Sequence, residues 1–179
     1  SGDVKCWGSG RFGKLGSGSS FNLGDHVNEM GANLPSIDVG GAVVQISAGG
    51  EHTCALLASG DVKCWGHATD GKLGYGDIED RGDSSNEMGA NLPTVDVGGA
   101  VVQIVPGGHH TCAVLTSGDV KCWGNGGHGQ LGYGDQNSRG RLSEEMGANL
   151  PTVDVGPELI ADLFASWTPS PPPLPPPPP

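Results

Sequence analysis

The strongest constraint on this 179-residue chain is an internal repeat with a period of 58 residues. The string Ser-Gly-Asp-Val-Lys-Cys-Trp-Gly starts at three positions, which are Ser1, Ser59 and Ser117. A second string, Glu-Met-Gly-Ala-Asn-Leu-Pro, keeps the same spacing and starts at Glu29, Glu87 and Glu145. Because both markers share one period, the chain repeats a single structural unit, and periods of this size are typical of propellers, solenoids and similar arrays.

Short apolar runs separated by Gly-Gly and Ser-Gly turns predict β-strands within each period. In one period these runs are residues 100–105, 110–116, 120–123 and 152–155. Glycines interrupt every window long enough to show a 3.6-residue period, so helix is a poor interpretation. Four strands are the content of one propeller blade. The sequence therefore predicts an all-β chain built from 58-residue β-propeller blades.

Composition agrees with a turn-rich β protein and excludes two classes of partner. The chain holds 33 glycines and 14 prolines but only 5% aromatic residues. Twenty acidic and nine basic side chains give a net charge of −11, which repels phosphate backbones and anionic lipid, so we expect no nucleic-acid partner. No apolar run approaches the ~20 residues of a membrane-spanning helix, so we expect no membrane span.

Three motifs connect the repeat to a known family. They are Gly-Glu-His-Thr-Cys-Ala-Leu-Leu at residues 50–57, Gly-Asp-Val-Lys-Cys-Trp-Gly at 60–66 and Gly-Lys-Leu-Gly at 71–74, with counterparts at 110–115 and 129–132. In these motifs the chain resembles the repeat family named after the regulator of chromosome condensation, whose members are seven-bladed β-propellers. The resemblance covers residues 1–156, and the Cys-containing form is most similar to the secreted and microbial branch of that family.

The length of the repeat region predicts an incomplete ring. Seven blades of this period would need about 400 residues, whereas residues 1–156 supply about two and a half to three blades. Two expectations follow. Either the chain is a fragment of a longer propeller, or units assemble head to tail, each protomer completing a blade of its neighbour.

Turn geometry predicts which cysteines face each other. If residues 58–60 form a three-residue hairpin loop with Gly60 as a left-handed bulge residue, Leu57 faces Asp61. Counting back along the two strands then places Cys54 directly opposite Cys64. This is a non-hydrogen-bonded pair, whose Cα separation of about 4.5 Å suits a disulfide.

The same count pairs Cys112 with Cys122 and leaves Cys6 unpaired, because its partner would lie ten residues earlier. Five reduced, buried thiols are one alternative, and zinc is another, although no short Cys-x-x-Cys spacing is present. Disulfides are the favoured interpretation. They predict an oxidising, extracellular setting for a secreted protein of the matrix, cell wall or cell surface.

The sequence offers no convincing catalytic, cofactor or metal site. Arg81-Gly82-Asp83 matches an integrin-type adhesion tripeptide, but Leu-Gly-Asp and Arg-Gly-Arg replace it in the other repeats, so chance is the better explanation. Acidic residues crowd the same loop without the ligand order of an EF-hand, and we interpret them as solvated; they are Asp77, Glu79, Asp80, Asp83 and Glu87.

Two kinds of recurring side chain have predicted structural roles. His52 and His110 precede a strand Thr, where an imidazole commonly holds the adjacent loop by hydrogen bonding. Trp7, Trp65 and Trp123 are expected to pack between blades. No nucleophile, base and carboxylate recur at a convincing position, so we expect no enzymatic activity.

The composition changes after the last repeat. In residues 157–168 the apolar positions predict a short capping helix, or alternatively an added strand. Residues 169–179 predict a polyproline II tail. Its candidate sites for partner binding or modification are Pro169, Pro171, Pro172, Pro173, Pro175, Pro176, Pro177, Pro178 and Pro179. The tail is similar to hydroxyproline-rich wall and matrix glycoproteins, which implies hydroxylation and a glycan; a ligand for SH3 or WW domains and a simple spacer are the alternatives.

Together these features predict a non-enzymatic, extracellular structural or interaction module, in which disulfide-linked blades are attached to a proline-rich rod. Its partners would be other proteins or further copies of the chain. Two alternatives remain open at this point. One is a regulator of a small GTPase, similar to the nucleotide exchange factor of the same family, and the other is a secreted propeller-type enzyme inhibitor.

Overall fold

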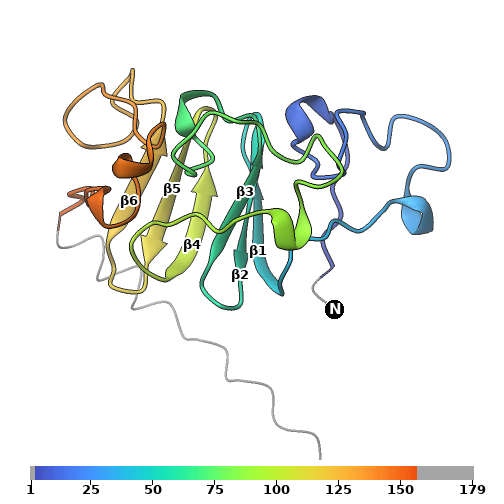
Figure 1. The fold of residues 1–179 in the computed structure, drawn as a ribbon, viewed down its shortest axis with the longest axis horizontal. Helices are drawn as coiled ribbons and strands as arrows, with labels where there is room; N and C mark the ends of the chain where they lie inside the picture. The colour runs from blue at the N-terminus through green and yellow to red at the C-terminus, as the bar shows by residue number, and fades with distance from the viewer. Residues whose placement is uncertain (1–2, 157–179) are drawn as a thin grey trace, which may run out of the picture.

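The computed structural model describes residues 3–156, which fold into two antiparallel three-stranded sheets placed side by side (Figure 1). The first sheet has the order β1-β2-β3, and its strands are Val43–Ala48, His52–Leu57 and Val62–Gly66. The second sheet has the order β4-β5-β6, and its strands are Val101–Pro106, His110–Leu115 and Val120–Gly124. Each sheet is one blade of the predicted type, so the all-β class and the propeller-blade repeat are confirmed. The predicted segments 157–168 and 169–179 lie outside the described residues.

Three of the four strands predicted for one period are present, within one residue at most ends. The fourth, residues 152–155, is reduced to a single contact: the N–H of Val153 donates to the carbonyl oxygen of Val120 at 2.7 Å. Val95 and Ile37 make the same bond, to Val62 and Val4, in the other two repeats. Residues 152–155 are irregular on both sides of Val153, so only this residue bonds to the outer strand. The prediction of a full fourth strand was therefore too long.

Each blade hairpin turns through the predicted bulge. Gly60 has a φ of +87°, and the N–H of Leu57 donates to the carbonyl oxygen of Asp61 at 2.9 Å. Glycine is needed at this position because a Cβ disfavours positive φ. Strand pairing then places Cys54 opposite Cys64, as the count of the turn residues predicted.

Residues 3–42 contribute no sheet of their own, only isolated bridges between Val4 and Ile37 and between Gly8 and Leu23. They lie beside the first sheet, in blue in Figure 1, and the loops that follow β6 lie at the opposite end. The described part of the chain is thus a row of units in sequence order.

All helices among the described residues are single 3-10 turns of three residues. They are Arg11–Gly13, Gly31–Asn33, Thr69–Gly71, Gly89–Asn91, Ser143–Glu145 and Gly147–Asn149. Three of these turns are the Gly-Ala-Asn segment of the second repeated string. No helix in residues 3–156 has the length or apolar character to cross a membrane.

The core lies between the two sheets and depends on the stacking of blades. β2 is buried at all six positions because it is covered on both faces. β5, its counterpart one repeat later, alternates between half-buried and buried, because among residues 3–156 no further sheet covers its second face. The main cluster joins both blades and includes Val62, Leu73, Ile104 and Trp123.

Candidate interaction surface at the blade contacts

Both predicted disulfides are present, one in each blade. Cys54 is bonded to Cys64, and Cys112 to Cys122, with Cα atoms 4.1 Å apart in each pair. Each bond joins the central strand of a blade to its third strand. Cys6 has no disulfide partner among residues 3–156, and burial raises the pKa of its thiol.

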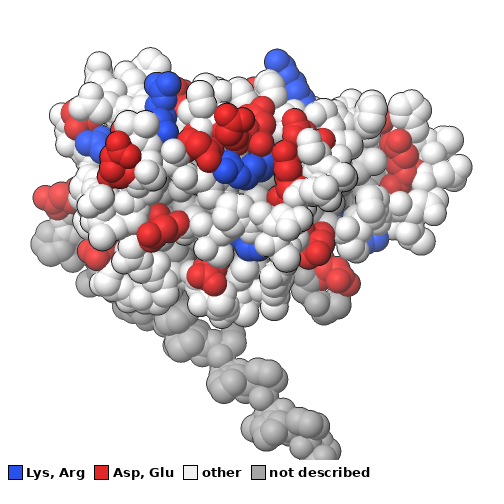
Figure 2. Space-filling view, in the orientation of Figure 1, with Lys and Arg blue, Asp and Glu red and all other residues white. Residues whose placement is uncertain are grey.

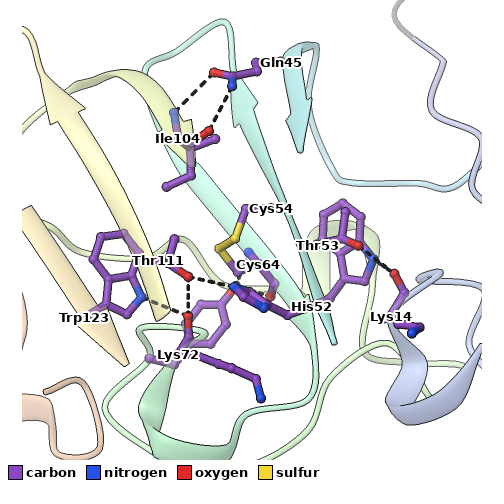
Figure 3. Close-up of a disulfide and its surroundings, with 12 residues drawn as sticks. Lys14, Gln45, His52, Thr53, Cys54, Cys64, Lys72, Ile104, Thr111 and Trp123 are labelled. Atoms are coloured by element: carbon purple, nitrogen blue, oxygen red, sulfur yellow. Dashed lines mark hydrogen bonds between the residues drawn. A yellow bond between two sulfur atoms is a disulfide. The ribbon is translucent and has the colours of Figure 1, made fainter. Parts of the chain in front are cut away.

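A backbone carbonyl of one repeat organises its contact with the next repeat (Figure 3). The carbonyl oxygen of Lys72 accepts hydrogen bonds from Thr111 Oγ1 at 2.8 Å and from Trp123 Nε1 at 3.1 Å. One period earlier, the carbonyl oxygen of Lys14 accepts from Thr53 at 2.8 Å and from Trp65 at 3.1 Å. The contact is therefore a property of the repeat.

The glycine two residues after each of these lysines makes room for the indole ring. A Cβ on Gly74 would lie 2.6 Å from Trp123 Nε1, and a Cβ on Gly16 would lie 2.8 Å from Trp65 Nε1. Both tryptophans are fully buried. The second glycine of the Gly-Lys-Leu-Gly motif is thus the floor of a tryptophan pocket, which confirms the inter-blade packing predicted for Trp65 and Trp123.

A second contact joins the inner strands of the two blades. Gln45 Nε2 donates to the carbonyl oxygen of Ile104 at 2.9 Å, and the N–H of Ile104 donates to Gln45 Oε1 at 3.2 Å (Figure 3). Gln45 follows a register irregularity in β1, and such bulges redirect side chains. Ile104 is fully buried at this junction.

His52 also acts across the blade contact, whereas the sequence predicted that it would hold its own adjacent loop. Its Nε2 lies 2.8 Å from Thr111 Oγ1. Since the single hydroxyl proton of Thr111 is donated to Lys72, the Nε2 of His52 must carry its own proton and donate. Burial, with the positive charge of Lys72, lowers the pKa of His52 to about 3, so the ring is neutral.

One side of this recurring contact is open in the first repeat. Trp7, at the position of Trp65 and Trp123, is 61% exposed, because no described residue supplies the lysine carbonyl and glycine floor. Ile46, at the position of Ile104, is 43% exposed. Both line a pocket of about 430 Å³ together with Cys6 and Leu15. The inter-blade packing predicted for Trp7 is thus not found among the described residues.

Acidic and basic side chains lie next to one another on the face shown in Figure 2. In the loop that carries the predicted acidic cluster, such neighbours form ion pairs. Asp77 Oδ2 pairs with Arg81 Nη2 at 2.7 Å, and the Arg81 guanidinium lies 4.1 Å over the ring of Tyr75. Arg139 repeats this arrangement one period later. Arg81 therefore has a structural role, although the adhesion role of Arg81, Gly82 and Asp83 stays a prediction.

The other acids of this loop are largely engaged within the fold. Glu87 Oε2 accepts three backbone N–H bonds, from Gly82, Asp83 and Ser84, at 2.8 to 3.1 Å. Asp80 accepts from the N–H of Ala68 at 2.7 Å. The recurrence of the glutamate therefore requires no ion, and the counterparts of Asp80, which are Asn22 and Ser138, accept the same backbone bond without being acidic.

Sequence reasoning missed the roles of Gln45 and of the lysine carbonyls. The available signal was recurrence: Gln103 repeats Gln45 and Lys72 repeats Lys14. A recurring lysine suggests that its side chain matters, however, whereas in Lys14 and Lys72 the backbone carbonyl accepts the hydrogen bonds from the next repeat. Only the spatial relation between neighbouring sheets reveals it.

Comparison with known proteins agrees with this architecture. Two descriptions of the regulator of chromosome condensation (RCC1) repeat match the chain, one at residues 43–72 and 101–130 and the other at residues 1–56. Together they cover more than half of the sequence.

Among curated relatives, the Ultraviolet-B receptor UVR8 of Arabidopsis thaliana is 33% identical over 158 residues, covering 86% of this chain and 33% of the receptor. The probable E3 ubiquitin-protein ligase HERC4 of Homo sapiens is 33% identical over 164 residues, covering 92% of this chain and 13% of the ligase. The chain thus spans a third or less of these relatives.

Among solved structures, Prp20p from Saccharomyces cerevisiae, described with its binding to Gsp1p and histones, superposes with a TM-score of 0.55. It is 22% identical, and the match covers 87% of this chain and 35% of Prp20p, so the likeness concerns the fold. The repeat matches, the two blades and the shared fold lead to one conclusion: this chain belongs to the regulator of chromosome condensation repeat family.

Proposed function

We propose that this chain is a non-enzymatic, extracellular interaction module that binds another repeat of its own type, head to tail, and is attached to a proline-rich rod. The two disulfides support the extracellular setting, since cytosolic thiols are kept reduced. A regulator of a cytosolic or nuclear GTPase would not be expected to carry two such bonds. Partner binding is the general activity of propellers in this family.

One observation supports the self-association above the others. The same tryptophan is fully buried in two repeats, where a preceding repeat covers it, and 61% exposed in the first. Exposed aromatic side chains beside a pocket are typical of interface anchors. The chain itself shows what such a tryptophan binds: Trp123 donates to the carbonyl of Lys72 and packs on Gly74.

The opposite end of the row carries the complementary groups. Gln130 occupies the position of Lys72, Gly132 that of Gly74, and Gln103 that of Gln45. Neither Gln103 nor the Gln130 carbonyl has a hydrogen-bond partner in a following repeat among residues 3–156. In the proposed contact, Trp7 of one copy donates to the Gln130 carbonyl of another.

If two copies pack as two neighbouring repeats do, a second contact forms between them. Gln45 clamps Ile104, which lies 59 residues later, so Gln103 of one copy would clamp the backbone of Ile46 in the next. Trp7 and Ile46 line one pocket, so a single copy that packs there would make both proposed contacts. Such a contact joins different faces, so it generates chains or rings of copies.

Sedimentation velocity of the 179-residue protein tests the assembly. The wild type should show mass that grows with concentration. Trp7→Ser removes one face and Gln103→Lys the other, and both residues lie outside the buried core, so each variant should fold and remain monomeric. A mixture of the two variants should form dimers and nothing larger. A wild-type monomer at all concentrations contradicts the self-association.

Intact mass of the protein secreted from a eukaryotic host tests the setting and the tail. Two disulfides and added mass on residues 169–179 are expected for an extracellular glycosylated rod. Unmodified prolines with the disulfides intact would instead favour the alternative of a secreted inhibitor that binds through its loops. Free thiols at residues 54, 64, 112 and 122 would contradict the extracellular role.

A further inference from the structure

Three side chains of different metal-binding types converge on the loop of the first repeat. Asp25, His26 and Glu29 each direct one ligand atom into a common region, and these atoms all lie within 4.8 Å of one another. His26 Nδ1 is 2.9 Å from Asp25 Oδ1 and 3.7 Å from Glu29 Oε1. These separations are close to those between ligands that share one ion with bonds of about 2 Å.

Hydrogen bonds from the loop fix one oxygen of each carboxylate, Asp25 Oδ2 and Glu29 Oε2. The other oxygens, Oδ1 and Oε1, face His26. Glu29 Oε2 accepts backbone N–H bonds from Gly24 at 2.7 Å and from Asp25 and His26 at 3.1 Å each. Asp25 Oδ2 accepts from Asn22 Nδ2 at 3.1 Å. A metal ion would thus meet ligands that are already oriented, because their outer-shell bonds are made by the loop.

The other repeats contain the same loop frame without the same ligands. Glu87 and Glu145 accept the corresponding three N–H bonds, so the anchored glutamate is a structural feature of the repeat. The second repeat keeps the aspartate as Asp83 but has Ser84 in place of the histidine. The third has Arg141 and Leu142 at these two positions.

Packing of a preceding repeat does not close this position. Ser84 and Leu142 correspond to His26, and both are exposed although another repeat lies in front of each. His26 would therefore stay accessible to a metal ion whichever unit packs against the first repeat.

We propose that Asp25, His26 and Glu29 form a surface site for a divalent transition metal of the Zn²⁺ type. One imidazole and two carboxylates are an established ligand class for Zn²⁺, with water completing four-coordination. The three ligands are different residues from Trp7, Ile46 and Gln103, although Trp7 lies beside the same loop: a Cβ on Gly24 would lie 3.5 Å from the Cβ of Trp7.

Calorimetric titration of the untagged 179-residue protein with Zn²⁺ alone tests the proposal, in a Cys6→Ser background that removes the thiol not bonded in a disulfide. One Zn²⁺ per chain is expected. His26→Ser copies the second repeat and should weaken binding by about tenfold or more, while thermal unfolding stays the same. Asp25→Asn should weaken it in the same direction. Unchanged affinity in His26→Ser overturns the proposal.

The second repeat allows a gain-of-site test. Ser84→His places an imidazole between Asp83 and the anchored Glu87, so the stoichiometry should rise from one Zn²⁺ to two. Leu142→His is the matched control, because Arg141 replaces the aspartate there, and its stoichiometry should remain one. A second site in the Leu142→His variant, or none in Ser84→His, shows that the three-residue set does not determine binding.

Discussion

The carbonyl oxygen of Lys72 lies 3.1 Å from the indole nitrogen of Trp123, so a backbone group of one repeat accepts a side-chain hydrogen bond from the next. Lys14 and Trp65 form the same pair one period earlier. Trp7 repeats the sequence position without a described partner. The three tryptophans thus form a series in which the local sequence is constant and the preceding unit differs.

Trp123→Phe should destabilise the protein because it removes the donor to the Lys72 carbonyl and part of a buried ring. The expected loss in the free energy of unfolding is about 1–3 kcal/mol, measured by urea denaturation. Trp7→Phe is the matched control at the same position of the repeat. Its ring is 61% exposed, so its effect on the monomer should stay below about 0.5 kcal/mol. Equal losses in the two variants would argue against the blade contact.

Gln45→Ala should loosen the junction between the inner strands. The amide of Ile104 loses its acceptor, so its hydrogen exchange should become faster, and the free energy of unfolding should fall by about 1–2 kcal/mol. Hydrogen exchange read by NMR measures the first effect directly. Gln103→Ala is the control, since Gln103 has no such partner among residues 3–156. Unchanged protection at Ile104 would contradict the clamp.

The fold within one blade could be predicted from the sequence because its determinants are local. A three-residue turn with Gly60 fixes the register of two strands, and the register fixes that Cys54 faces Cys64. The strand boundaries follow the glycines for the same reason. The fourth strand was predicted too long, because the alternation of Val153 and Val155 with polar residues indicates a strand although only Val153 bonds to the sheet.

The contacts between blades could not be predicted in the same way. His52 reaches Thr111, 59 residues away, and this depends on the angle between two sheets, which no turn motif encodes. The convergence of Asp25, His26 and Glu29 also depends on backbone bonds that fold the loop back. Recurrence identifies the positions that matter, but the structure shows which atom of each residue acts.

Removal of one disulfide should cost about 2–3 kcal/mol, as estimated from the loop it closes. The Cys54→Ser, Cys64→Ser double variant tests this by urea denaturation, with Cys6→Ser as the control that leaves both bonds intact. In intact mass after alkylation, the unfolded wild type should carry one label without reductant and five with it. Five labels without reductant would show that the bonds do not form in solution.

The stability of the protein should fall with acid because of His52. The pKa of His52 is about 3 in the folded protein and close to 6.5 in an unfolded chain, so between these values only the unfolded state binds the proton. The free energy of unfolding should therefore decrease as the pH falls from about 6.5 toward 3, by up to about 1.4 kcal/mol per pH unit. His52→Gln can still donate to Thr111 but does not titrate, so it should flatten this slope; His110, whose pKa is also lowered by burial, would retain its own share.

His26 provides the opposite case, because its hydrogen bond and charge interaction with Asp25 raise its pKa. NMR titration should show the His26 ring becoming protonated above pH 6.5 while the His52 ring stays neutral at pH 4, and protonation of His52 near pH 6 would contradict its buried position at the blade contact.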